Sequence, residues 1–523
     1  MNDSLHHRAS GIGQHEIGTR TDAIDPDWLW LGGILAIALI LRVINLDAGL
    51  WYDEIDTLVE YVRLPTFELL TSYHSLNNHM LFSLEAQLTT ALFGENAWAL
   101  RLPAMLMGLA SIWALWLLAR EIVSPWEARL STLLLAVSYH HVWFSQNARG
   151  YTGLLFWGLI ATYFLVRGSK NPTRLLWSGY GLAFALSMYT HLSAIFLFAA
   201  HGLSYLGLLF YRAIRDGKSA GRVTSVLTSQ SIGMPLFGIA VGGAITLLLY
   251  APILAQMVET FSAVRTTQPD ASEAAVAAIA KWHSPVWMIQ EVVRSFGALG
   301  PVMGLILIPA AVVLVFGLAG FFRTTPILPW IFVIHIPLTV IILSALSFRV
   351  WPRYFFVDIG YVCLFLVQGS FVIGRLCAPL FAARGARGVT AGRLGIAFTA
   401  LGVAASLVLL PKNYLHPKQD FVGARDLVET QRAPDAQVLT LGLASMPFAV
   451  YYAPQWRPIE TLDELESAAE SGSEVWLVYT FPAVTERRYE DIAHYVSTNF
   501  KLVQYFPGTL GGGGVVVFRQ DPK

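Results

Sequence analysis

The segment WLWLGGILAIALILRVIN at residues 28–45 and the segment DAGLWYDEIDTLVEYVR at 47–63 decide the fold of this chain. The first is apolar and long enough to cross a bilayer as a helix. The second then presents Asp53, Glu54 and Asp56 next to lipid, where a charge without compensation is costly. Together the two segments predict a membrane protein whose first loop carries carboxylates for a functional reason.

The composition is typical of a protein with many membrane-spanning segments. Of the 523 residues, 55% are hydrophobic and 13% are charged, whereas about a quarter of the residues of a soluble domain are charged. The formal net charge is zero, which argues against nucleic acid as a partner, because domains that bind phosphate backbones carry a basic excess. The two cysteines lack C-x-x-C spacing, so neither a disulfide framework nor a thiolate zinc site is expected.

Apolar runs of about twenty residues predict about eleven transmembrane helices. The predicted fold class is therefore a polytopic α-helical membrane protein, with its transmembrane domain at residues 28–411. The runs lie near 28–46, 97–118, 128–144, 151–166, 175–188, 191–211, 233–255, 300–322, 328–347, 354–374 and 394–411.

Basic residues decide the predicted orientation, because loops held in the cytoplasm collect Lys and Arg. They cluster at 167–174, 212–222 and 375–393. Placing these loops inside makes residues 1–27 a cytoplasmic N-terminal tail and residues 47–96 a single long outer loop. Everything after the last span is then also outside.

Residues 412–523 change character and are expected to form an extracytoplasmic soluble domain. The glycine-rich segment at 508–514 lacks the Lys-Ser/Thr of a phosphate loop, so it is expected to be a mobile turn between two strands. Alternation of strands and helices predicts a small α/β domain. The predicted strands are 436–443, 474–481, 501–506 and 514–519, and the predicted helices are 419–431, 461–472 and 487–500.

Polar residues that interrupt the apolar sequence fall mostly on one predicted side of the membrane. They come from the first loop, from SQNARGY at 145–151, from MYTHLS at 188–193 and from SFRVWPRYFF at 347–356. A carboxylate can accept a proton from a hydroxyl, and Arg side chains match phosphate oxygens. Charge at one depth, drawn from distant loops, is typical of an interfacial active site and indicates a lipid phosphate as substrate.

The motifs LWYDEIDTL, NNHMLFSL, FGENAWALRLPAMLMG, WFSQNARGYTGLLF and RYFF, in this order, resemble the GT-C superfamily of membrane glycosyltransferases. The nearest resemblance is to bacterial relatives of protein mannosyltransferases and of the lipid A aminoarabinose transferase. It covers most of the first 170 residues well and the remaining spans more loosely, and the C-terminal domain resembles the extracytoplasmic domain of many such proteins.

This resemblance implies an inverting glycosyltransferase of the EC 2.4 class in the bacterial cytoplasmic membrane, with residues 28–411 as the catalytic domain. The enzyme would move a sugar from a polyprenyl phosphate donor to an acceptor hydroxyl on the outer face. Membrane lipids and a cell-envelope acceptor are the other implied partners. Whether the acceptor is a protein, a lipid or a polysaccharide stays open.

The resemblance also implies roles for single residues. Asp53 would be the general base that deprotonates the acceptor, and Glu54 would support or orient it. The residues expected to bind the donor phosphate are His79, Arg349, Arg353 and Tyr354. The residues expected to line the cavity are Asn147, Arg149 and Tyr151. Other histidines are left outside the core site: His191 as an intramembrane histidine, and His140 and His141, which are assigned no metal.

Two departures from the family pattern matter. Relatives often have proline after the loop histidine, but Met80 follows His79 here. Some relatives also carry a second acid near the third span that helps to hold a metal, whereas residues 129–215 contain no Asp or Glu. No cofactor and a metal-independent reaction are therefore expected. A divalent ion held by Asp53, Glu54 and water stays an open alternative.

Each assignment has a structural alternative. Asp53 and Glu54 also fit a charge pair at a helix N-terminus, the arginines fit interfacial anchors, and His79 fits an ordinary polar residue. A transporter or flippase for a lipid-linked or anionic substrate is the competing class of protein, although no second copy of the Asp-Glu loop is present. A membrane-anchored scaffold acting through its tail would leave the charges near the spans unexplained.

Overall fold

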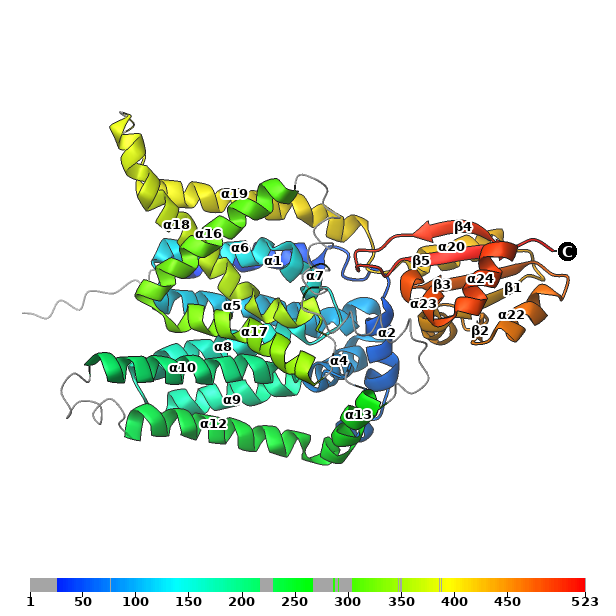
Figure 1. The fold of residues 1–523 in the computed structure, drawn as a ribbon, viewed down its shortest axis with the longest axis horizontal. Coiled ribbons are helices and arrows are strands. Elements are labelled where there is room, and N and C mark those ends of the chain that lie inside the picture. The colour runs from blue at the N-terminus through cyan, green and yellow to red at the C-terminus, as the bar shows by residue number, and fades with distance from the viewer. Residues whose placement is uncertain are drawn as a thin grey trace, which may run out of the picture.

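The computed structural model describes residues 26–75, 77–216, 229–266, 286, 290, 303–346, 348, 350–384, 386 and 388–522. In this part of the chain a bundle of long helices carries a small sheet domain at one end (Figure 1). The predicted fold class, a polytopic helical protein with a C-terminal α/β domain, is confirmed.

Of the about eleven predicted spans, the described part of the chain shows fewer as single helices of membrane-spanning length and hydropathy. Seven described helices are long and apolar enough to cross a membrane. Several predicted spans form shorter helices, because Pro125 begins one helix and Ser138 separates it from the next. The helices of the bundle are α1 (Pro26–Val43), α5 (Ala97–Ile122), α6 (Pro125–Val137), α7 (Tyr139–Ser145), α8 (Tyr151–Lys170), α9 (Arg174–Thr190), α10 (Ala194–Asp216), α12 (Ser229–Tyr250), α13 (Leu254–Thr266), α16 (Met303–Thr324), α17 (Ile327–Ala345), α18 (Ile359–Ala383) and α19 (Ala391–Leu415).

Glycine allows two of the long helices to touch along their backbones. A Cβ atom at Gly317 of α16 would lie 1.8 Å from the carbonyl oxygen of Phe365, and one at Gly369 of α18 would lie 1.9 Å from that of Val313. Only glycine fits such a contact, which is a common way for helices to associate in a membrane.

The connection between α1 and α5 lies at the end of the bundle that faces the sheet domain (Figure 1). It contains the short helices α2 (Tyr52–Thr57) and α3 (Thr66–Thr71) and the apolar helix α4 (Met80–Phe93). At the N-terminus of α2, the Glu54 side chain accepts a hydrogen bond from the backbone amide of Trp51, the N-cap residue, at 3.2 Å. This cap sets the direction in which the first turn of α2 projects its side chains.

The C-terminal domain is a five-stranded sheet in the order β2-β1-β3-β5-β4. Strands β1, β2 and β3 are parallel, and β5 joins β3 and β4 in antiparallel pairs. The short strand β2 was not predicted, because it has three residues and contains a proline. The strands are β1 (Gln437–Leu441), β2 (Arg457–Ile459), β3 (Val475–Thr480), β4 (Lys501–Phe506) and β5 (Val515–Gln520), and the main helices are α20 (Phe421–Gln431), α22 (Leu462–Ala469), α23 (Pro482–Arg488) and α24 (Glu490–Asn499).

The glycine-rich segment 508–514 connects β4 to β5 as predicted, but it is anchored rather than free. The amides of Thr509 and Leu510 donate to the carbonyls of Pro417 and Lys418, at 2.9 and 3.1 Å. These bonds fasten the turn to the linker that follows α19.

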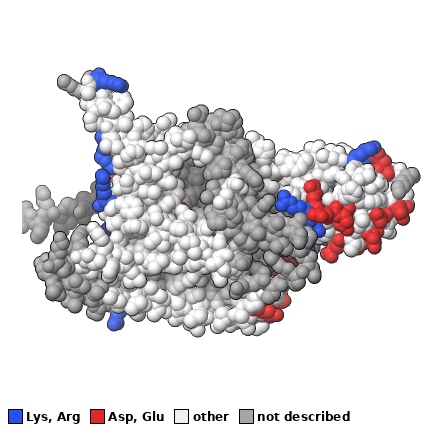
Figure 2. Space-filling model, in the orientation of Figure 1, with Lys and Arg blue, Asp and Glu red and all other residues white. Residues whose placement is uncertain are grey.

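Charged side chains are distributed unevenly over the molecule. Figure 2 shows Lys and Arg at the end of the bundle farthest from the C-terminal domain, whereas Asp and Glu gather on that domain. On the face shown, the far end of the bundle carries mainly basic side chains, whereas the C-terminal domain carries acidic side chains together with some basic ones.

Candidate active site

Asp53 lies in the first turn of α2, and its ionic partner comes from a distant part of the sequence. Its Oδ2 accepts a hydrogen bond from Arg353 Nη1 at 2.9 Å. Arg353 is carried by η3 (Pro352–Asp358), a short helix just before α18. The Asp53 side chain remains 13% exposed and that of Arg353 27%. The structure thus brings the predicted base and a predicted phosphate ligand together in a partly accessible pair.

Glu54, predicted beside Asp53, is fully buried in a salt bridge. Arg101 donates from Nε to Oε1 at 2.7 Å and from Nη2 to Oε2 at 2.6 Å. The amides of Ala148 and Trp51 donate to the same oxygens at 2.7 and 3.2 Å. Burial alone would raise the pKa of Glu54, but Arg101 and Lys418 outweigh it and the pKa is lowered. With both oxygens occupied, Glu54 is placed to hold α2 in position rather than to take part in bond making.

Arg101 is a residue of this site that the sequence reasoning did not assign. Besides Glu54, it donates to the carbonyls of Leu46, Ala48 and Gly49 at 2.8, 2.6 and 3.0 Å. It therefore fastens the connection between α1 and α2 to α5. Its motif ALRLP contributes to the family resemblance, but a pairing across 47 positions cannot be read from spacing.

His79 is a buried neutral imidazole whose tautomer is fixed by a backbone amide. Gly150 N donates to His79 Nδ1 at 2.7 Å, so Nδ1 is the acceptor and the ring proton is on Nε2. Burial first, and then the charge of Arg149, lowers the pKa of His79 well below its ordinary value. Arg149 Nη2 lies 3.1 Å from His79 Nε2. Two N–H donors therefore face each other at this point.

Arg149, in the turn just before α8, contacts the first loop at two residues. Its Nη1 donates to Thr57 Oγ1 at 2.8 Å, and its Nη2 donates to Asn77 Oδ1. Thr57 in turn donates to the carbonyl of Asp53 at 2.8 Å. Arg149 Nε is buried, and it has no hydrogen-bond partner in the described residues. The same holds for Arg353 Nε. The site therefore contains several N–H donors that have no acceptor among the described residues.

His191, which the sequence reasoning left outside the core site, lies among the predicted residues. Its ring centroid is 4.5 Å from that of His79, 5.3 Å from that of Tyr151 and 5.9 Å from that of Tyr354. The amide of Ser193 donates to His191 Nδ1 at 3.1 Å, which again leaves the ring proton on Nε2. MYTHLS did show a polar interruption, but the sequence did not show that it turns the chain between α9 and α10.

The remaining predicted residues have different positions. Tyr151 and Tyr354 belong to the ring cluster around His191. Asn147 is 1% exposed, and its Oδ1 accepts a bond from Trp51 Nε1 at 3.0 Å, so it anchors the cap of α2. Arg349 lies outside the described residues.

Asp56 is a second carboxylate on α2 next to the site. Its Oδ2 accepts a hydrogen bond from Asn77 Nδ2 at 2.7 Å. Burial raises the pKa of Asp56, and the bond from Asn77 opposes this shift in part. Through Asn77, Asp56 is connected to Arg149.

The sequence favours a metal-independent reaction, with a divalent ion held by Asp53, Glu54 and water as the alternative. In the described ranges, no group of three or more His, Cys, Asp and Glu side chains could hold a metal ion. His141 instead contacts Arg42 Nη2 at 2.5 Å through Nδ1 and Ser111 Oγ at 2.8 Å through Nε2. This histidine joins α1, α5 and α7 inside the bundle.

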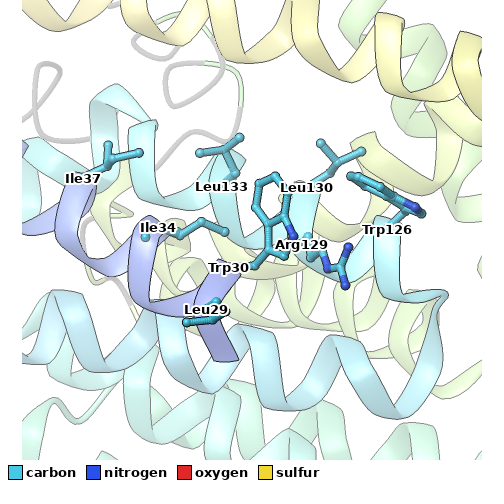
Figure 3. A pocket seen from close by; sticks show the side chains of 9 residues that line it. Leu29, Trp30, Ile34, Ile37, Trp126, Arg129, Leu130 and Leu133 are labelled. Atoms are coloured by element: carbon cyan, nitrogen blue, oxygen red, sulfur yellow. The ribbon is translucent and has the colours of Figure 1, made fainter. Parts of the chain in front are cut away.

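An apolar pocket between α1 and α6 is separate from the site (Figure 3). It has a volume of about 560 Å³ and is lined by aliphatic side chains together with Trp30, Trp126 and Arg129. Arg129 forms an ion pair with Asp27 at the start of α1, whereas α2 follows the other end of that helix. The pocket thus lies at the end of α1 remote from Asp53.

Comparisons with known proteins agree with the fold. Residues 80–218 match the family model described as dolichyl-phosphate-mannose-protein mannosyltransferase. The apo structure of ArnT from Cupriavidus metallidurans is similar with a TM-score of 0.52 and 15% identity, over 95% of this chain and 98% of that chain. ArnT bound to undecaprenyl phosphate gives 0.46 and 13%, over 94% and 97%. The S. cerevisiae Pmt1-Pmt2 complex bound to the sugar donor gives 0.35 and 16%, over 44% and 34%. No curated protein sequence matches this chain.

The fold and the matched segment together confirm the predicted resemblance to the GT-C superfamily of membrane glycosyltransferases. The fold of this chain is similar to that of ArnT from C. metallidurans over nearly the whole length of both chains.

Proposed function

We propose that this protein is an inverting glycosyltransferase that moves a sugar from a polyprenyl phosphate donor to an acceptor hydroxyl. The observation that carries the proposal is the pair of opposed donors, His79 Nε2 and Arg149 Nη2, which lie 3.1 Å apart. Two N–H groups that face each other at this distance repel one another, and an anionic oxygen that accepts a hydrogen bond from both would stabilise the arrangement. Arg149 Nε and Arg353 Nε supply further donors without acceptors in the described residues. A phosphate is an anion with enough oxygens to satisfy them.

The reaction follows from the charges that the site would stabilise. The bond between the anomeric carbon and the phosphate oxygen breaks, so positive charge develops on the sugar ring and negative charge on the leaving phosphate. Arg149, Arg353 and the neutral imidazole of His79 would stabilise the phosphate with little reorganisation. The polyprenyl phosphate then departs with the bonding electrons.

Asp53 supplies the other half of the reaction. Its carboxylate accepts the proton of the acceptor hydroxyl while the hydroxyl oxygen forms a bond to the anomeric carbon. Attack from the face opposite the leaving phosphate inverts that carbon. Arg353 donates to Asp53 through Nη1, so the same guanidinium is placed to contact the base and the leaving phosphate.

The donor class and the membrane orientation have separate support. The description of the family model that matches residues 80–218 names dolichyl phosphate mannose as the sugar donor. Dolichyl phosphate mannose is a polyprenyl phosphate sugar. Lys and Arg at the end of the bundle opposite the site agree with a site on the outer face of the bacterial cytoplasmic membrane (Figure 2). The C-terminal domain would then also be extracytoplasmic.

We propose a metal-independent reaction. Glu54 is the residue expected to share a divalent ion with Asp53, but both oxygens of Glu54 already accept bonds from Arg101, Ala148 and Trp51. Dialysis against EDTA is therefore expected to leave turnover unchanged.

The reaction class is tested by donor consumption. The purified protein is offered a panel of polyprenyl phosphate sugars with crude envelope extract, and each donor is followed by mass spectrometry. Consumption of one donor with release of the free polyprenyl phosphate supports the proposal and identifies the sugar. Donors that are bound or moved across vesicles but never cleaved would favour the transporter or flippase instead.

A further inference from the structure

Gln419 joins the C-terminal domain to the helix that carries Asp53. Its side chain is 2% exposed, and its Oε1 accepts a bond from the amide of Tyr52 at 3.0 Å. Its Nε2 donates to Thr480 Oγ1 at 2.9 Å and to the carbonyl of Gly513 at 3.2 Å. An amide donor on one side and a carbonyl acceptor on the other fix the orientation of the Gln419 amide. One side chain thus bridges α2, the end of β3 and the turn before β5.

The contacts around Gln419 make the C-terminal domain part of the same packed body. Lys418 Nζ donates to the carbonyl of Gln146 at 2.6 Å, and Trp143 Nε1 donates to Thr509 Oγ1 at 3.1 Å. Tyr452 OH donates to the carbonyl of Leu50 at 2.8 Å. The three residues on the bundle side lie near the site: Leu50 just precedes α2, Gln146 belongs to SQNARGY, and Trp143 lies just before that segment.

An apolar core continues across this boundary. Leu50, Ile55 and Leu58 of the α2 region belong to one buried cluster with Phe421 and Phe448 of the C-terminal domain. The C-terminal domain is therefore packed against the bundle and is not connected to it by the segment after α19 alone. A shift of the domain would move α2.

We propose that Gln419 is a positioning residue through which the C-terminal domain fixes Asp53 for catalysis. The inference rests on the proposed role of Asp53 as general base. The first amides of a helix have no carbonyl partner within the helix, so side chains must accept them. Glu54 accepts the amide of Trp51, and Gln419 accepts that of Tyr52, the residue before Asp53. Loss of the second acceptor frees the turn that aims the Asp53 carboxylate.

The first test is kinetic. Gln419→Ala is expected to lower kcat about tenfold or more with an unchanged donor KM, since small misplacements of a catalytic group cost this much. In an Asp53→Asn background the same substitution is expected to cause no further loss of the residual rate. Gln437→Ala is the matched control, because Gln437 lies in the same sheet at the amino end of β1, away from Thr480. Thr480→Val is a second variant that removes the anchor on the domain side.

The second test does not depend on activity. Hydrogen exchange of the peptide covering residues 50–58 is expected to become faster in Gln419→Ala, while the peptide of α5 stays protected. If the wild type consumed no donor, the proposed function would fail. The hydrogen-exchange measurement would still show whether Gln419 holds α2 in place. A folded Gln419→Ala protein with unchanged kcat and unchanged exchange at 50–58 would overturn the inference, as would an equal loss in the Asp53→Asn background.

Discussion

The two ion pairs at the site differ in their surroundings, and they should respond differently to substitution. Glu54 and Arg101 are 0% and 1% exposed, and both Glu54 oxygens carry further backbone donors. Asp53 and Arg353 are partly exposed and share a single hydrogen bond. The buried pair is suited to holding structure, and the open pair to meeting a substrate.

Removal of one partner of the buried pair is expected to destabilise the protein. Arg101→Met removes the salt-bridge partner of the buried Glu54 carboxylate, and breaking a buried pair in this way typically costs about 3 to 5 kcal/mol of unfolding free energy. Thermal unfolding in detergent measures the loss. Arg63→Met is the control, because Arg63 pairs with Glu95 on the surface. Equal stability of both variants would contradict the structural role of Arg101.

His79 makes stability depend on pH. Folding lowers the pKa of His79 from its ordinary value. Below about pH 6.5, His79 is therefore protonated in the unfolded chain but stays neutral in the folded chain. Stability is therefore full above this pH and is lost as the pH falls through it, with a limit of about 1.4 kcal/mol per pH unit. Unfolding midpoints between pH 8 and 5 should fall more steeply in the wild type than in His79→Gln. The exposed His74→Gln serves as control.

At the scale of elements, α2 is held by contacts from three parts of the chain. Arg101 comes from α5, Asn147 from the turn before α8, Arg149 from the same turn, and Gln419 from the linker after α19. The contacts reach both the cap and the last residue of the helix. Such a short helix would be marginal alone, so its direction is set by these partners.

Arg149 should affect donor binding more than fold. Arg149→Met keeps the length of the side chain but removes the donors that face His79 and Asn77. We expect a rise of at least about tenfold in the dissociation constant of the donor, the size of one charge-assisted hydrogen bond. Binding of polyprenyl phosphate in detergent measures it. An unchanged constant in the folded variant would exclude Arg149 from the phosphate site.

Local sequence predicts some of these elements and not others. The strands of the C-terminal domain alternate or run apolar over five or six residues, and four of them were predicted. Helix α2 was readable from its acids and its apolar spacing. The partners of its acids were not, because Arg353 lies 300 positions from Asp53 and Arg101 lies 47 from Glu54. Long-range pairing depends on tertiary packing, which spacing does not encode.

At the scale of the whole molecule, charge and packing define two ends. Lys and Arg mark the end of the bundle away from the C-terminal domain, while α2 lies at the other end, beside that domain (Figures 1 and 2). The shared apolar cluster of Leu50 and Phe421 connects the domain to the site. Composition already indicated that this is a membrane protein. The docking of the C-terminal domain could not be predicted, because its contacts join residues that are far apart in the sequence, such as Tyr52 and Gln419, which are separated by 367 positions.

The orientation is tested by cysteine labelling. In a variant with Cys363 and Cys377 replaced by Ala, Ser467→Cys on the C-terminal domain should react with a membrane-impermeant maleimide in intact cells. Asn171→Cys, in the basic loop between α8 and α9, should react only after the membrane is opened. Labelling of both in intact cells, or of Asn171→Cys alone, would contradict an extracytoplasmic site.

The central claim is that Asp53 is the base of a sugar transfer, and one comparison tests it most directly. Transfer from the identified polyprenyl phosphate sugar is measured for the wild type, for Asp53→Asn and for Glu95→Gln, a control in the same loop whose carboxylate pairs with Arg63. The account predicts that Asp53→Asn, folded and with an unchanged unfolding midpoint, loses at least about a hundredfold in kcat, while Glu95→Gln keeps the wild-type rate. A folded Asp53→Asn protein that transfers sugar at the wild-type rate would contradict it.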